Sequence, residues 1–282
     1  MRRGAGRVRV GTSGWRYASW RGDFYPAGLR QRDELSHLSR LVTSVEVNGS
    51  FYSLQRPERY RSWAAAAPPH FEFAVKGGRY ITHLRQLQGV ETALANHWAS
   101  GVLALGPALG PTLWQLPARS QFDEDRLDTF LSLLPLTAGE AATLACQHDD
   151  KVAEGRTQTQ LEVGVDPATP VRHALEPRHQ SFDDPRARAL LDRHGVALVE
   201  SDSAGTWPRF AALTTDHAYV RLHGEDRLYG GGYAAATLDA WAERIRGWSA
   251  EGIDSYVYFD NDIDGRAPHD AVSLLERLAD IP

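Results

Sequence analysis

A carboxylate and an amide alternate with valines in one short apolar run of the sequence. Glu46 lies between Val45 and Val47, and Asn48 follows, so a β-strand here would turn Glu46 and Asn48 to one face. An ionised carboxylate is costly to bury without a partner. An edge strand whose polar face meets water would explain the pattern equally well. The run therefore predicts either a functional group or a solvated strand edge.

Polar side chains stand at the end of several further apolar runs. The pairs that would share one strand face are Glu176 with Arg178, Glu200 with Asp202, and Arg221 with His223. Other runs end in polar residues at Thr12 and Ser13, at Lys76, at Gln115, and at Asp260 and Asn261. Because the carboxyl ends of the strands form the active face of a (β/α) barrel, we expect these side chains to gather there.

Carboxylates and an imidazole in such a place are suited to general acid–base catalysis. Glu46 is the predicted acid or base, and Glu176 or His223 is the second proton-transfer group. The predicted ligand-binding residues are the cations Lys76, Arg178 and Arg221 for anionic groups, and the amides Asn48, Gln115 and Asn261 for orientation.

Structural roles for the same residues stay open. Ion pairs between Glu176 and Arg178, or between Glu46 and Lys76, could fill a polar barrel interior. His223 could equally be a core histidine with its hydrogen bonds satisfied.

Neither an organic cofactor motif nor a metal-ligand spacing such as H-E-x-x-H occurs in the sequence. Cys146 is the only cysteine, which excludes an intrachain disulfide and a cysteine-based zinc site. Asp, Glu and His residues at strand ends could still bind a metal. A catalytic metal is therefore possible but not favoured, and the cofactor is unknown.

Two glycine-bearing loops follow the last two predicted strands. The first contains Arg227 and Gly231, and the second contains Gly265 and Arg266 just before a helix. Barrel enzymes often bind phosphate with this pair of loops, using backbone amides at a helix N-terminus. A phosphate-binding role is predicted for Arg227, Gly231 and Arg266. The acidic residues of both loops fit a flexible hairpin tip equally well.

Aromatic residues are concentrated in segments that follow predicted strands. They are Trp15, Tyr17, Trp20, Phe24 and Tyr25, then Phe51 and Tyr52, and later Trp207, Tyr229 and Tyr233. Such rings are suited to stacking on sugars or bases, and Tyr52 is a ligand-binding candidate. Packing of long loops against a barrel would explain many of them as well.

Short apolar runs alternate with helical patterns along nearly the whole chain. The predicted strands are residues 8–13, 44–48, 71–76, 112–116, 173–178, 196–202, 218–223 and 255–260. The predicted helices are residues 57–66, 90–105, 123–134, 183–194, 237–251 and 268–279. Eight strands with intervening helices predict an α/β fold, a TIM-type (β/α) barrel in a single domain over residues 1–282. A doubly wound open sheet is the alternative.

Two local features refine this scheme. The stretch 137–170 is too long for a plain connection and predicts an extra helix near residues 140–152. In the helix over 183–194, Asp183 is the expected N-cap, with Pro185 in the first turn and Gly195 after the end.

The composition is that of an ordinary folded protein. Of 282 residues, 42% are hydrophobic and 24% charged, and the formal net charge is −5, which disfavours nucleic-acid binding through bulk charge but not through a local patch. Neither a signal peptide nor an apolar stretch near the roughly 20 residues of a bilayer span is found. A cytoplasmic location without membrane contact is expected, and the oligomeric state is undetermined.

The combination of motifs resembles the DUF72 (YecE-like) family. The motifs that carry the resemblance are G-T-S-G-W at 11–15, V-E-V-N-G-S-F-Y at 45–52, F-A-V-K at 73–76, L-W-Q-L-P at 113–117, E-P-R-H at 176–179, Y-V-R-L-H-G at 219–224 and Y-F-D-N-D at 258–262. The resemblance runs from about residue 8 to 278 and implies a TIM-type barrel. It implies no particular reaction, because the family has no established function.

Two departures from the family pattern stand out. The stretch 137–170 looks like an insertion relative to the family's shorter link between strands four and five. Pro177 stands where the family usually has an aromatic residue, and a proline there could bend the strand and re-aim Arg178.

Three classes of function follow from these observations. The favoured one is an uncharacterised DUF72-like barrel enzyme that acts on a small polar or phosphate-containing ligand at the carboxyl face of the barrel. The alternatives are a nucleic-acid-binding or repair-type barrel, with loop aromatics stacking on bases, and a non-catalytic binding protein.

Overall fold

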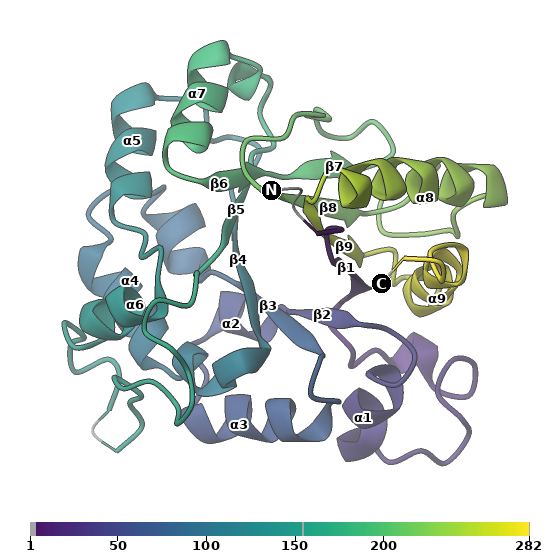
Figure 1. The fold of residues 1–282 in the computed structure, drawn as a ribbon, viewed down its shortest axis with the longest axis horizontal. Coiled ribbons are helices and arrows are strands. Elements are labelled where there is room, and N and C mark those ends of the chain that lie inside the picture. The colour runs from purple at the N-terminus through teal and green to yellow at the C-terminus, as the bar shows by residue number, and fades with distance from the viewer. Residues whose placement is uncertain (1–3, 154, 282) are drawn as a thin grey trace. The chain divides into compact units, whose positions relative to one another are not determined.

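Strands and helices alternate throughout the structure, a computed structural model that describes residues 4–153 and 155–281 (Figure 1). The strands in this part of the chain are β1 Val8–Ser13, β2 Ser44–Val47, β3 Glu72–Lys76, β4 Leu109–Gln115, β5 His173–Glu176, β6 Val196–Leu198, β7 Glu200–Asp202, β8 His217–Leu222 and β9 Asp254–Phe259. The α-helices are α1 Glu34–Leu38, α2 Gly49–Tyr52, α3 Pro57–Ala66, α4 Glu91–Ala99, α5 Glu124–Ser132, α6 Ala138–Ala145, α7 Pro185–Arg193, α8 Ala235–Ala250 and α9 Ala267–Arg277. Short 3-10 helices are η1 Ala18–Trp20, η2 Gln31–Asp33, η4 Val102–Ala108 and η5 Gln180–Phe182, and η3 Tyr80–Leu84 is a π-helix.

The chain divides into two compact units, residues 1–46 with 197–282 and residues 47–196. In the first unit the parallel strands follow the order β2-β1-β9-β8-β7. In the second unit they follow the order β3-β4-β5. Parallel strands that alternate with helices are the repeating element of a TIM-type barrel, so the predicted fold class is confirmed. The single-domain expectation stays a prediction.

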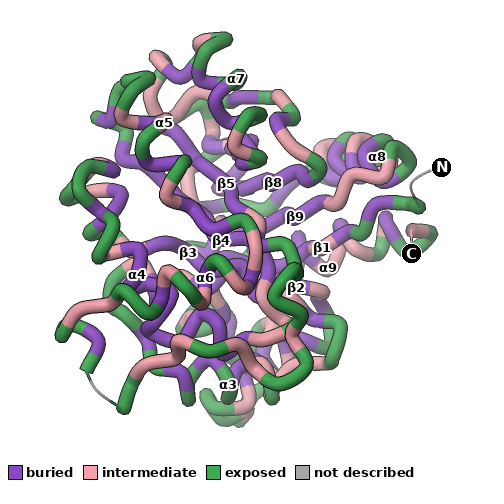
Figure 2. Tube along the Cα trace, turned by 60° about the vertical axis from the view of Figure 1, so that its left-hand side comes forward, coloured by how far each residue is buried: buried purple, intermediate pink, exposed green. Residues whose placement is uncertain are grey.

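Helices α8 and α9 cover the strands of the first unit. Helix α9 contacts β1 and β9, and α8 contacts β9 and α9 (Figure 1). On α8 the buried face includes Leu238, Trp241 and Ile245. Strand β8 is buried along its whole length, and β9 nearly so (Figure 2). Strands buried on both faces are typical of parallel sheets covered by helices.

Strands β1 and β2 approach each other so closely that position 11 has no room for a side chain. A Cβ atom on Gly11 would lie 1.8 Å from the carbonyl oxygen of Ser44. Glycine is the residue that permits such a backbone approach. The pairing places Ser13 directly opposite Glu46.

The helix predicted over residues 90–105 is broken into α4 and η4. Gly101 lies between them with φ of 121°, a value that favours glycine and cannot continue an α-helix. The helix predicted near 140–152 is present but shifted, as α6. Thr137 and Glu140 form a capping box that starts α6 at Ala138. Residue 154 of the stretch 137–170 lies outside the described residues, and its assignment as an insertion stays a prediction.

The sixth predicted strand is two short strands, β6 and β7, separated at Val199. Near the break, the amide of Leu198 donates to the hydroxyl of Thr214 at 2.9 Å. Eight predicted strands therefore become nine in the described chain.

The N-cap of α7 is Asp184, whereas the sequence predicted Asp183. The Asp184 carboxylate accepts from the amide of Arg186, the standard N-cap bond. Asp183 instead lies at the C-terminal end of η5 and forms an ion pair with Arg188.

The substitution Asp184→Ala is expected to lower the free energy of unfolding by about 1 kcal/mol, the usual cost of losing an N-cap side chain. Asp183→Ala is the matched control, because it also removes a carboxylate paired with an exposed arginine. Its expected cost is below about 0.5 kcal/mol. Urea unfolding followed by circular dichroism measures both. Equal losses in the two variants would contradict the assignment.

Candidate active site

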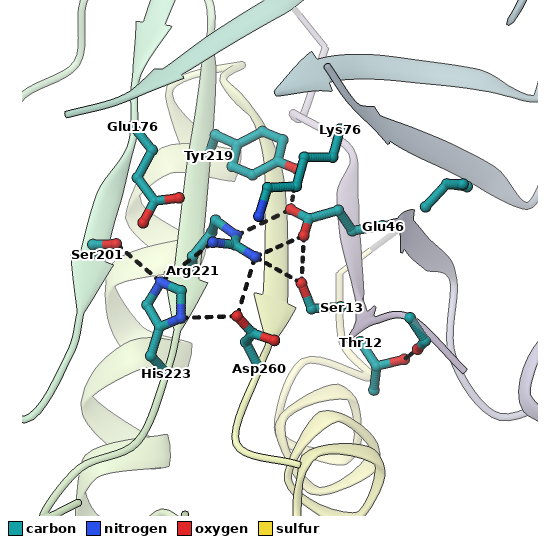
Figure 3. Close-up of polar contacts among 12 residues, drawn as sticks. Thr12, Ser13, Glu46, Lys76, Glu176, Ser201, Tyr219, Arg221, His223 and Asp260 are labelled. Carbon is teal, nitrogen blue, oxygen red and sulfur yellow. Dashed lines mark hydrogen bonds and ion pairs between the residues drawn. The ribbon is translucent and has the colours of Figure 1, made fainter. Parts of the chain in front are cut away.

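Arg221 of β8 is the centre of a buried hydrogen-bonded cluster in the first unit (Figure 3). Its side chain is only 1% exposed. The guanidinium binds Glu46 with two bonds, from Nη2 to Oε1 at 2.8 Å and from Nε to Oε2 at 3.1 Å. Nη2 also donates to Oδ2 of Asp260 at 3.2 Å. One buried cation thus compensates two carboxylates, as burial of charge requires.

Glu46 accepts two hydrogen bonds on each carboxylate oxygen. Besides Arg221, Oε1 accepts from the hydroxyl of Ser13, and Oε2 accepts from the hydroxyl of Tyr219 at 2.7 Å. Burial, and then the charge of Glu46, raise the pKa of Tyr219, so its hydroxyl keeps the proton that it donates. These contacts make Glu46 an anchor for Arg221.

His223 lies between a carboxylate and a hydroxyl. Its Nδ1 is 2.9 Å from Oδ2 of Asp260, and its Nε2 is 3.2 Å from the hydroxyl of Ser201. The rings of Trp207 and Tyr229 meet the imidazole edge-on, each with centroids 5.5 Å away. Asp260 keeps 16% of its side chain exposed, whereas His223 is fully buried. A histidine held by a carboxylate in this way has a fixed ring orientation.

Strand geometry explains why these side chains meet. Tyr219, Arg221 and His223 alternate along β8 and therefore share one face. The hydrogen-bond ladder continues beyond the strand ends, because the amide of Asp260 donates to the carbonyl of Leu222 at 2.8 Å. Asp260 is thereby held beside His223 at the carboxyl ends of β8 and β9.

The sixth predicted strand contributes a different residue from those expected. Glu200 and Asp202 share the face that sequence parity assigned to the site, yet Ser201 is the residue that contacts the cluster. Glu200 instead pairs with Arg209 at 2.8 Å and Arg244 at 2.5 Å. The expectation that Glu200 joins the cluster is therefore wrong, since it is committed to these two arginines.

Asp262, in the loop after β9, is a buried carboxyl group. Within the described chain, neither of its oxygens has a well-formed hydrogen bond, and the indole nitrogen of Trp20 also lacks one. Burial, and then the charge of Asp260, raise the pKa of Asp262 well above its usual value. Hydrogen-bonding contacts from the side chains of Tyr17 and Trp20 lower this pKa in part, although their geometry falls short of a well-formed bond. Asp260 and Asp262 therefore differ in environment although they are two residues apart.

Glu176 and Arg178 form an ion pair in the second unit. Nη2 of Arg178 lies 2.9 Å from Oε1 of Glu176, and both side chains are nearly buried. The Glu176–Arg178 ion pair that the sequence left open as a structural role is therefore formed. Pro177 does not prevent the two side chains from meeting. A catalytic role for Glu176 and a ligand-binding role for Arg178 stay predictions.

The two amide candidates make hydrogen bonds inside the fold. Gln115 donates to the carbonyl of Leu116 at 2.8 Å. Asn261 donates to the carbonyl of Gly231 at 2.7 Å and to the carboxylate of Asp270 at 2.8 Å. Asn261 is fully buried, and its two hydrogen bonds link the loop after β9 to the loop of Gly231 and to α9. The substrate-orienting role of both amides stays a prediction.

The remaining ligand-binding candidates of the second unit follow β2 or end β3. The ammonium of Lys76 lies 4.7 Å from the ring centroid of Phe51, a cation–π distance. Asn48 directly precedes α2, and Tyr52 ends it with 72% of its surface exposed. Ligand binding by Lys76, Asn48 and Tyr52 stays a prediction.

The predicted phosphate loops are filled by an internal carboxylate. Asp264 pairs with Arg227 and accepts from the amide of Gly231 at 2.8 Å. These are the groups that a phosphate would need. Arg266 is exposed. Phosphate binding by these loops stays a prediction.

The described residues contain no group of three or more His, Cys, Asp or Glu side chains arranged to hold a metal ion. Every helix in residues 4–153 and 155–281 is too short or too polar to span a bilayer.

Comparison with known proteins identifies the family. A family model described as "Protein of unknown function DUF72" matches residues 9–281. The chain belongs to the DUF72 family. The UPF0759 protein YecE of Escherichia coli K12 is 22% identical over 272 residues, which cover 96% of this chain and 92% of YecE.

Two crystal structures of DUF72 family proteins share the fold. The protein from Thermotoga maritima MSB8 has a TM-score of 0.71 and 24% identity, covering 97% of this chain and 99% of its own. The protein from Enterococcus faecalis V583 has a TM-score of 0.70 and 16% identity, covering 96% and 95%. The resemblance inferred from the motifs is therefore confirmed.

Most of the buried cluster lies in the motifs by which the sequence resembles the DUF72 family. Those residues are Ser13, Glu46, Tyr219, Arg221, His223, Asp260 and Asp262. Ser13 and Asp260 were expected at the active face as strand-end polar residues, but no catalytic or binding role was predicted for either of them or for Tyr219. No sequence pattern pointed to Ser201, because the break at Val199 changes which side chains of the sixth predicted strand face the cluster.

The substitution Arg221→Met is expected to lower the free energy of unfolding by about 3–5 kcal/mol, because it leaves buried carboxylates without a cation. The double variant Glu46→Gln with Arg221→Met removes one of those charges. It should recover at least about 1 kcal/mol relative to Arg221→Met alone. Urea unfolding of the single and double variants tests this coupling. Additive losses would contradict it.

The substitution Asp262→Asn is expected to reduce the loss of stability at higher pH. The folded-state pKa of Asp262 lies above its unfolded value of about 3.9. Between these two values the folded state holds a proton that the unfolded state has lost, so stability falls as pH rises through that window. An amide does not ionise. The melting temperature of the variant, minus that of the wild type, should therefore increase from pH 4 to pH 8, and a constant difference would argue against a raised pKa.

Proposed function

We propose that this DUF72 protein is an enzyme that acts on a small polar ligand by general acid–base catalysis. The observation that carries the proposal is His223, oriented by Asp260 beside the buried Arg221–Glu46 pair. Replacing buried ion pairs by well-packed apolar residues is often neutral or stabilising. Stability alone therefore explains such a cluster poorly, which supports a functional role for it.

The proposed base is the Asp260–His223 couple. Asp260 is the partly exposed end of the cluster and contacts the ligand, and His223 shares the proton through Nδ1. Arg221 compensates the negative charge of Asp260, and Glu46 positions Arg221. Glu46 is then a positioning residue rather than the acid or base expected from the sequence, while His223 keeps its predicted role.

The proposed acid is Asp262. Burial and the neighbouring charge of Asp260 favour its protonated form. Carboxyl groups whose environments separate their protonation states can work as an acid and a base at one pH. The ligand class that fits is a hydroxyl-bearing molecule, with Trp207 and Tyr229 beside His223 as apolar contacts.

A more specific form of this proposal is that the ligand carries a phosphate group. It requires Asp264 to release the amide of Gly231 and the side chain of Arg227. Nucleic-acid binding and non-catalytic binding stay as the alternative hypotheses.

A test uses conversion of small probes in deuterium oxide. The wild-type protein is incubated with polyols, hydroxyketones, aldoses and their phosphate esters, and proton NMR follows deuterium incorporation or product formation. His223→Gln and Asp260→Asn are each expected to lower the rate of a converted probe by about 10²–10⁴-fold. The control is His269→Gln, because His269 forms an exposed pair with Asp23 at 3.0 Å and should leave the rate unchanged.

The outcomes separate the hypotheses. Conversion that survives both substitutions in the cluster would sink the acid–base proposal. A probe that binds without conversion, and loses binding in both variants, would favour a non-catalytic binding protein. Faster conversion of phosphate esters than of free polyols would support the phosphate variant.

A further inference from the structure

A cavity of about 260 Å³ lies in the second unit, and none of its lining residues belongs to the buried cluster. Its walls come from α2, η3, α4 and the segments beside them. The chemistry-bearing residues that line it are Phe51, Tyr52, Arg79, Tyr80, His97 and Lys151. Ligand cavities in proteins are usually about 300–1,000 Å³, so this cavity suits a small ligand with a single ring system.

The rim of this cavity is positively charged. Arg79 is exposed and has no ion-pair or hydrogen-bond partner for its side chain within residues 4–153 and 155–281. The ammonium of Lys151 lies 5.4 Å from the ring centroid of Tyr80 and 3.8 Å from the carboxylate of Asp149. None of the described lining residues is acidic. The cavity therefore favours an anion.

Exposed aromatic rings stand at the same cavity. Tyr52 is 72% exposed and Tyr80 is 45% exposed, and Leu54 beside them is 40% exposed. Large apolar side chains that gather at a concave site are typical of ligand binding. Two tyrosine rings with flat apolar faces favour a planar aromatic partner.

His97 forms part of the wall of this cavity. The side chain lines the cavity, is almost fully buried, and its Nε2 has no partner in the described chain. Burial, and then His173, lower the pKa of His97 to about 3, so the ring is neutral near pH 7. The Nε2 atom is itself sealed from the cavity, so His97 contributes a neutral wall rather than a bonding partner for a ligand.

We propose that this cavity binds a small aromatic anion. The ring lies against Tyr52 and Tyr80, and the anionic group lies near Arg79. The proposal does not rest on the acid–base function of the first unit. It gives the ligand-binding role predicted for Tyr52 a specific cavity and a specific ligand class.

The test uses indole-3-carboxylate as the probe, with indole-3-carboxamide and cyclohexanecarboxylate for comparison. Proton–nitrogen NMR titration of the full chain at low salt measures the dissociation constants. We expect saturable binding of indole-3-carboxylate, with the neutral amide and the saturated-ring acid each binding at least about threefold more weakly.

Substitutions at the cavity provide the second arm. Arg79→Gln should weaken binding about threefold, and Tyr80→Ala should weaken it about threefold to tenfold. Ala93→Phe, which places a ring in the cavity, should abolish binding. The matched control is Arg156→Gln, because Arg156 is an exposed arginine of the same unit outside the cavity and should not affect binding.

Several results would overturn the proposal. These are the absence of saturable binding, equal affinity for the carboxylate and the carboxamide, and equal effects of Arg79→Gln and Arg156→Gln. Unchanged binding by a folded Ala93→Phe variant would do the same. If Ala93→Phe does not fold, the surface variants Tyr52→Ala and Tyr80→Ala decide, because neither ring is needed for core packing.

Discussion

The two-bond ion pair between Arg221 and Glu46 is the interaction on which the candidate active site depends. Both side chains are buried, and each would be a costly unpaired charge without the other. Arg221 also reaches Asp260, and through Asp260 the cluster extends to His223. The backbone makes this possible, because parallel strands in register bring residues from opposite ends of the chain to one face.

In the proposed mechanism, the cluster separates positioning from proton transfer. Glu46, with both oxygens saturated by donors, has no remaining capacity for a ligand, whereas Asp260 retains contact with solvent. Asp262, two residues further, is buried without a well-formed hydrogen bond. Such a group is unfavourable for folding, which supports its place in the proposed mechanism.

Local chemistry made most elements predictable. Helix α3 has the predicted bounds because Pro57 suits the first turn, and β1 has them because its apolar residues alternate with glycine and polar residues over one short run. Elements were misjudged where a distant partner or an unusual backbone conformation decided the result. The hydroxyl of Thr214 accepts a hydrogen bond from the amide of Leu198 beside the strand break. Gly101 adopts a backbone conformation that ends α4.

The sequence by itself determined which residues could do chemistry and which of them share a strand face. It thereby identified Glu46, Arg221 and His223, and the motifs that resemble the DUF72 family. Only the tertiary structure decided which partner each polar group meets. Arg221 lies 175 residues from Glu46 in the sequence, and Ser201 rather than Glu200 contacts His223. Periodicity is local, whereas pairing, burial and the protonation of Asp262 depend on register between distant strands and loops.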